Sequence, residues 1–172
     1  MIEGILECWR THDEINLYLL RHIPDEGFDA VTLLKNGQPS KGRNVARIFC
    51  HLHEVRRSHI GRDFLKGVPA FADEYVPTRA ELLQAFEAAG KGIEQRLCRT
   101  VQENARFKER SGLALLGYLI SHEAHHRGQI VLALKQSAIR MPELMKFGIW
   151  MHWSKPQPGI LEEPTAPVRR AE

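Results

Sequence analysis

The sequence predicts an all-α protein, a four-helix bundle in up-down order with a long first connection and a short additional helix at its C-terminal end. Apolar residues recur at intervals of three and four residues over four long windows. No segment shows the sustained alternation of apolar and polar residues that is typical of half-buried strands. Helices that each carry one apolar face bury those faces most simply against one another, so a bundle is the expected architecture.

The first helix is expected from the N-terminus to the residues before Pro24. Pro24 and Gly27 end it. The positions on its buried side are Ile2, Ile5, Leu6, Trp9, Asn16, Leu17 and Leu20. A long connection follows over about residues 24–42, because its prolines and glycines interrupt any helix. Within this connection the segment FDAVTLL can form a short turn against the core.

The second and third helices have clear ends. The second is expected over about residues 43–60, with Gly61 as its terminator. The third begins at a capping box formed by Thr78 and Glu81, and apolar residues then repeat every three to four positions. Two glycines weaken the middle of this third helix, because glycine loses more conformational freedom on folding than other residues.

The fourth helix is expected from near Ser111 to about Ser137, and its wide apolar arc indicates burial on more than one side. After it, Pro142 can begin a short helix that carries Leu144, Phe147, Trp150 and Trp153. The whole chain of 172 residues has the length of one ordinary domain. We therefore predict a single domain over residues 1–154 and a Pro-rich C-terminal tail over residues 155–172.

Charge and cysteine content narrow the class of protein. The net charge of +3 comes from 24 basic and 21 acidic side chains spread along the chain, without a basic tract, so we expect no nucleic-acid partner. No stretch approaches the ~20 apolar residues of a membrane span. The cysteines are odd in number and far apart, which argues against a disulfide framework and against a thiolate zinc site. The three cysteines are Cys8, Cys50 and Cys98. Together, these features of charge, hydropathy and cysteine content favour a cytoplasmic protein.

Three histidines within five residues of the fourth helix are the strongest chemical signal. Residues four apart on a helix differ by about 40° in direction and about 6 Å in height, so the imidazoles of His122 and His126 can converge on one divalent metal ion. His125 falls almost opposite the centre of the apolar face and is expected to face solvent. Two histidines hold a metal weakly, so a third ligand is expected from another helix.

The second helix offers His51, His53 and His59. His51 and His53 point about 200° apart, so at most one of them can join the site. The apolar neighbours of His51 favour it slightly, but His53 stays open as the alternative. His59 lies near the centre of the apolar face and is expected to be a buried histidine bonded to a carbonyl group.

The segments FCHLHEVR and SHEAHHRGQI together resemble the DinB/YfiT-like family of metal-binding four-helix bundles, over roughly residues 1 to 137. The resemblance implies three metal ligands, His51, His122 and His126. It implies one divalent ion, with zinc or nickel first and iron, copper or manganese as further candidates, and it implies a homodimer. Some relatives transfer low-molecular-weight thiols, so the resemblance implies a metal-dependent enzyme of thiol transfer or hydrolysis that acts on a small-molecule substrate.

Two alternatives to this function stay open. One is a non-catalytic, stress-related dimer that binds metal. The other, less favoured, is a zinc peptidase, because His122, Glu123 and His126 form a literal HExxH motif. The extended form of that motif needs glycine and histidine where this chain has Gln129 and Leu132.

Two further expectations concern residues around the site. Gly128 is expected to mark close helix packing, because glycine inside a helix otherwise only destabilises it. The residue that moves protons is left open among four candidates, which are Asp13, Glu54, Tyr118 and Glu123.

Overall fold

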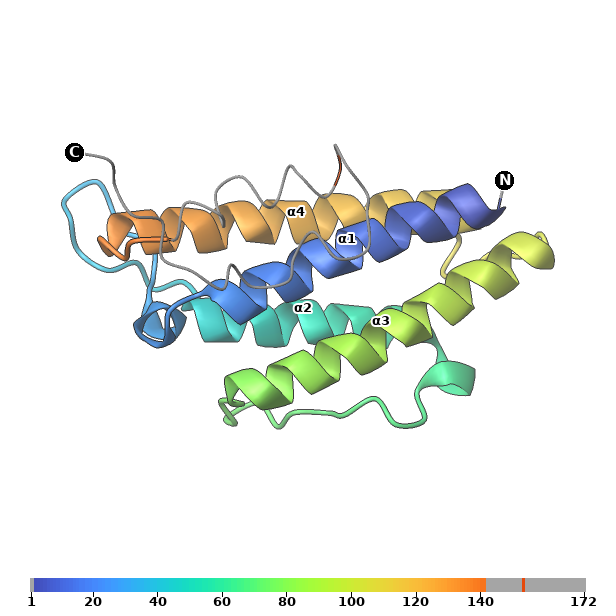
Figure 1. The fold of residues 1–172 in the computed structure, drawn as a ribbon, viewed down its shortest axis with the longest axis horizontal. Coiled ribbons are helices and arrows are strands. Elements are labelled where there is room, and N and C mark those ends of the chain that lie inside the picture. The colour runs from blue at the N-terminus through green and yellow to red at the C-terminus, as the bar shows by residue number, and fades with distance from the viewer. Residues whose placement is uncertain (1, 142–152, 154–172) are drawn as a thin grey trace, which may run out of the picture.

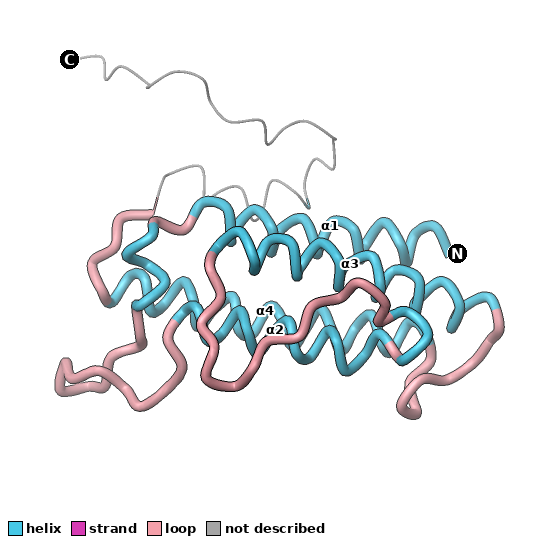
Figure 2. The backbone as a smooth tube through the Cα atoms, turned by 90° about the horizontal axis from the view of Figure 1, so that it is seen from below, coloured by secondary structure: helices cyan, strands magenta, loops and turns pink. Residues whose placement is uncertain are grey.

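The computed structural model describes residues 2–141 and Trp153. These residues form α1 (Ile2–His22), α2 (Val45–Ile60), α3 (Arg79–Gln102) and α4 (Gly112–Gln136), with the short 3-10 helices η1 (Asp25–Asp29) and η2 (Arg62–Phe64). The four long helices lie side by side in one bundle (Figures 1 and 2), and the described residues contain no strand beyond two isolated bridges. The predicted all-α bundle is thus confirmed. The predicted C-terminal helix and the tail lie outside the described residues, apart from Trp153.

The directions of the helices differ from a simple up-down alternation at one step. Phe49 contacts Phe86 at a ring distance of 5.7 Å, and the carbonyl of Ile60 accepts a hydrogen bond from Arg96, so α2 and α3 run in the same direction. The segment 61–78 therefore returns along the bundle before α3 begins (Figure 1). An extended chain covers ~3.3 Å per residue and a helix only ~1.5 Å, so this segment is long enough to run back past α2.

Local sequence explains where the helices begin and end. The side chain of Asn44 accepts a hydrogen bond from the amide of Arg47 and caps α2. Gly61 ends the same helix with a φ of 82°, which glycine adopts without strain. The capping box of Thr78 and Glu81 is present at the start of α3, as predicted. The N-terminal caps, Asn44 and Thr78, satisfy amides that have no partner within the helix.

The core consists of two apolar clusters separated by a layer of buried polar side chains. The first cluster lies around Phe49 and Phe86, and the second lies around Trp9 and Ile93. Each buries side chains from all four long helices. The polar layer between them contains the buried residues His12, Asn16, Arg56, Glu123 and Arg127.

Two glycines in α3 lie in close contacts with neighbouring helices, whereas Gly128 does not. A Cβ atom added at Gly90 would lie 2.2 Å from Oδ2 of Asp13, and one added at Gly92 would lie 3.0 Å from Ile60. Gly128 is exposed, and a Cβ atom there would meet no described atom within 4 Å. The expectation of close packing at Gly128 is therefore wrong, because this residue lies on the solvent side of α4.

None of the described helices is both long enough and apolar enough to cross a membrane.

Candidate metal centre

Three histidines from two antiparallel helices meet on one side of the polar layer. The ring of His51, on α2, lies 5.3 Å from the ring of His122 and 4.8 Å from that of His126, both on α4. The rings of His122 and His126 are 4.7 Å apart. One nitrogen from each of the three rings lies within 4.8 Å of the others. His51 and His122 are half-buried and His126 is buried, so the cluster is reached from the surface.

His53 does not join this cluster. Its Nε2–H donates a 2.8 Å hydrogen bond to the carbonyl of Pro69, and its ring packs 5.2 Å from that of Phe71. Of the two histidines, His51 is therefore the one that lies with His122 and His126. His59 bonds the carbonyl of Val55 at 2.8 Å, as expected. His125 is exposed, also as expected.

The electrostatics of the cluster keep its rings neutral. Burial, followed by the charge of Arg43 and the two neighbouring histidines, lowers the pKa of His51 to about 4. Burial also lowers the pKa of His122 and that of His126. A neutral imidazole carries the lone pair that a metal ion requires. These rings therefore offer lone pairs rather than positive charges at neutral pH.

The donor set fits a single divalent ion. Three imidazoles suit zinc, nickel, copper or iron. Nitrogens bound to one zinc ion are at most ~4 Å apart, so the rings would need only a small movement toward one another. Nδ1 of His122 is buried and has no hydrogen-bond partner among the described residues. An unpaired polar atom in a closed core costs free energy. At a site where an ion can bind, the lack of a hydrogen-bond partner has an explanation.

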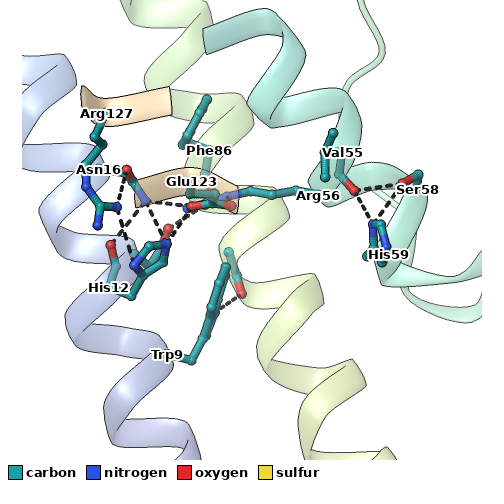
Figure 3. Close-up of polar contacts among 12 residues, drawn as sticks. Trp9, His12, Asn16, Val55, Arg56, Ser58, His59, Phe86, Glu123 and Arg127 are labelled. Atoms are coloured by element: carbon teal, nitrogen blue, oxygen red, sulfur yellow. Dashed lines mark hydrogen bonds and ion pairs between the residues drawn. The ribbon is translucent and has the colours of Figure 1, made fainter. Parts of the chain in front are cut away.

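A buried polar network surrounds Glu123 (Figure 3), the residue that directly follows His122 in the chain. Arg56 donates two hydrogen bonds to Glu123, of 2.8 Å and 2.9 Å. His12 and Asn16, both on α1, donate to the same carboxylate at 2.8 Å and 2.7 Å. Arg127 donates to the side-chain oxygen of Asn16 at 3.0 Å. The network thus connects α1 with α2 and α4, the two helices that carry the three histidines.

The charge states of His12 and Glu123 follow from burial and from their neighbours. Burial lowers the pKa of His12 despite its contact with Glu123, so His12 is neutral and its contact is a hydrogen bond rather than an ion pair. Burial alone would raise the pKa of Glu123, but Arg56 and His12 together lower it below its ordinary value. The carboxylate of Glu123 is therefore ionised, fully buried and bound to other side chains. The sequence signalled this network only through Asn16, a polar residue on an apolar face.

The position of Glu123 removes the observation on which the peptidase alternative rested. In an HExxH enzyme the glutamate serves as the base that activates metal-bound water. Here both oxygens of Glu123 are bound within the network on the core side of α4. The HExxH letters in this chain therefore describe two cluster histidines and one structural carboxylate.

Tyr118 is the proton-transfer candidate that lies against the cluster. Its ring stacks on that of His122 at 5.8 Å with an interplanar angle of 21°. The guanidinium of Arg110 lies 4.4 Å above the same ring. The other candidates are engaged elsewhere: Glu123 in the network, Asp13 with Arg56, and Glu54 with Arg57 on the surface.

In this all-α bundle, α2 and α4 direct three histidines toward one point. The protein therefore falls in the class of helical bundles with a candidate metal site. The chain belongs to the DinB family, whose sequence profile matches residues 2–145. It is also similar to the uncharacterized protein YrdA of Bacillus subtilis (strain 168), with 26% identity over 165 residues that cover 86% of this chain and 95% of that protein. The family resemblance carried by the two histidine segments is thereby confirmed.

Proposed function

We propose that this protein is a metal-dependent enzyme that transfers a low-molecular-weight thiol to a small molecule or hydrolyses a small molecule. The observation that carries the proposal is the convergence of His51, His122 and His126 in a cluster that solvent can reach. Catalytic metal sites use three protein ligands and keep one position for water or substrate, whereas structural sites are closed. Zinc or nickel is the first choice of ion, with iron, copper or manganese next.

A divalent ion bound there would lower the pKa of a bound thiol or water and so supply a nucleophile near neutral pH. The residues of the chain hold the geometry around it. Arg56 and Glu123 keep α2 and α4 aligned behind the histidines. Tyr118 covers one face of His122 and is the residue we propose for proton transfer. We further propose that the protein works in the cytoplasm as a homodimer.

Metal analysis of the purified protein tests this proposal. Replacement of His51, His122 or His126 by alanine is expected to abolish zinc or nickel binding. His22→Gln is the matched control, because His22 lies outside the cluster and bonds the carbonyl of Tyr18. Thiol transfer to a chromogenic electrophile, or hydrolysis of a chromogenic ester, should disappear with a chelator and return with added metal. Full metal content and activity in His122→Ala would contradict the proposal.

A further inference from the structure

The side chain of Gln129 bridges two histidines of α4. Its Oε1 lies 2.8 Å from Nδ1 of His126, and its Nε2 lies 3.0 Å from Nε2 of His125. Gln129 follows these histidines by three and four residues, so all three side chains lie on one stretch of the helix surface. We infer that Gln129 is a positioning residue, which holds His126 with its proton on Nδ1 and its lone pair on Nε2, the nitrogen left for a metal ion.

The inference follows from the two different ends of an amide. The oxygen of Gln129 can only accept, so the Nδ1 atom that it faces must carry a proton. If the amide were reversed, its NH₂ group would face Nδ1 of His126, and the ring proton would then sit on Nε2. A protonated Nε2 has no lone pair and binds no metal. The direction of one amide therefore decides whether His126 can act as a ligand.

His125 binds the other end of the amide. Nε2 of His125 accepts a hydrogen bond from the NH₂ group of Gln129, and the amide oxygen is then left to face His126. His125 is exposed and is not part of the cluster. It is nevertheless connected to the cluster through Gln129. The run of His125, His126 and Gln129 is thus one functional unit, although only one of its members reaches the ion site.

The arrangement singles out His126 among the three cluster histidines. No hydrogen bond to the ring of His51 or His122 is found within the described part of the chain, and Nδ1 of His122 is buried without a partner. Partners behind metal-binding histidines commonly fix the tautomer and ring direction, and their loss typically lowers metal affinity by about 10–100-fold. His126 is therefore the ligand whose direction the protein sets in advance.

The first experiment tests the tautomer itself and needs no metal. Long-range ¹⁵N–¹H NMR spectra of the metal-free protein report which ring nitrogen of His126 carries the proton. The wild type should show Nδ1–H. Gln129→Leu, which removes the acceptor, should show Nε2–H or a mixture, and His125→Ala should also give a mixture because the amide is then free to reverse. A wild-type ring with Nε2–H, or an unchanged tautomer in Gln129→Leu, would overturn the inference.

The second experiment measures affinity and rests on the proposed metal site. Zinc dissociation constants from competition with a chromogenic chelator should rise about 10–100-fold in Gln129→Leu. Gln129→Glu keeps an acceptor for His126 and should bind as tightly as the wild type, with the same Co²⁺ visible spectrum. Gln95→Leu, on the exposed side of α3, is the matched control and should bind unchanged. Equal losses in Gln129→Leu and Gln129→Glu would contradict a role for the acceptor.

The two experiments separate the possible failures. A wild-type protein that binds neither zinc nor cobalt would contradict the proposed function, while the NMR result would still decide the role of Gln129. Thermal unfolding of the metal-free variants completes the set. Similar midpoints for Gln129→Leu and wild type are expected, so that any loss of affinity reports the ligand geometry rather than the fold.

Discussion

Arg56 on α2 binds both carboxylate oxygens of Glu123 on α4, at 2.8 Å and 2.9 Å, and neither side chain is exposed. The two helices joined by this pair are those that carry the histidine cluster. Glu123 directly follows His122 in the chain. The same turn of α4 therefore presents a metal-ligand candidate on one side and a buried anion on the other.

Arg56→Leu is expected to destabilise the protein strongly. The substitution leaves the buried carboxylate of Glu123 without its cation, and such a loss costs about 3–5 kcal/mol. Arg57→Leu is the control, because its partner Glu54 is 45% exposed and surface pairs contribute about 0–1 kcal/mol. Urea unfolding of both variants measures the difference. Equal losses in the free energy of unfolding would show that the buried pair of Arg56 and Glu123 contributes no more to stability than the surface pair.

Asp13 should make stability fall as the pH rises from about 4 to about 6. Burial raises the pKa of Asp13 to about 6, because it outweighs the neighbouring charge of Arg56. Between the unfolded pKa of about 4 and this value the native state binds more protons than the unfolded chain, so the free energy of unfolding decreases with rising pH. Above pH 6 the loss is complete, at ~1–3 kcal/mol.

Urea unfolding of wild type and Asp13→Asn at several pH values checks this dependence. The variant has no group that titrates at this position, so the difference in unfolding free energy between the two proteins should change across the window. Other acidic groups contribute equally to both proteins and cancel in the difference. A difference that stays constant from pH 4 to pH 7 would show that Asp13 has an ordinary pKa.

Gly90→Ala and Gly128→Ala should change stability in opposite directions. The new Cβ atom at position 90 would lie 2.2 Å from Oδ2 of Asp13, which is held by Arg56, so we expect a loss of about 1–3 kcal/mol. At position 128 the space is open, and alanine should stabilise the helix by about 0.5–1 kcal/mol. Thermal or urea unfolding distinguishes the two. Stabilisation by Gly90→Ala would rule out the close approach of α3 to α1.

Tyr118→Phe should lower the turnover rate without loss of metal. The phenylalanine ring keeps the stack on His122, but the hydroxyl group is gone. Proton transfer by a positioned side chain contributes about 10²–10⁴-fold to rates, so a fall of at least ~10-fold in kcat is expected. Tyr75→Phe, at an exposed tyrosine bonded to Glu81, serves as the control. An unchanged kcat in Tyr118→Phe would show that another group or solvent transfers the proton.

Local features of this fold could be predicted from the sequence. Helix ends depend on side chains a few residues away, so the capping box of Thr78 and Glu81 and the terminator Gly61 were visible directly. The spacing of His122 and His126 is equally local, because one helical turn brings the two rings together. These are the elements in which prediction and structure agree.

Relations between distant segments could not be predicted in this way. His12 and Glu123 meet across 111 residues of sequence, and each alone looks like an ordinary polar residue on a helix. The choice between His51 and His53 required the rotation of α2 relative to α4. The parallel course of α2 and α3 required the path of the segment 61–78, in which glycines and prolines prevent a long helix but specify no direction.

The polar layer in the middle of the core has a consequence for how the helices align. Hydrocarbon packing alone tolerates a slide of α4 by one turn, ~5.4 Å, because leucines would again meet leucines. Such a slide would separate the Glu123 carboxylate from Arg56 and leave it among apolar side chains. Apolar packing would not offset the free-energy cost of this unpaired buried charge. The buried pair thus sets the register of the bundle, and with it the height at which His122 and His126 face His51.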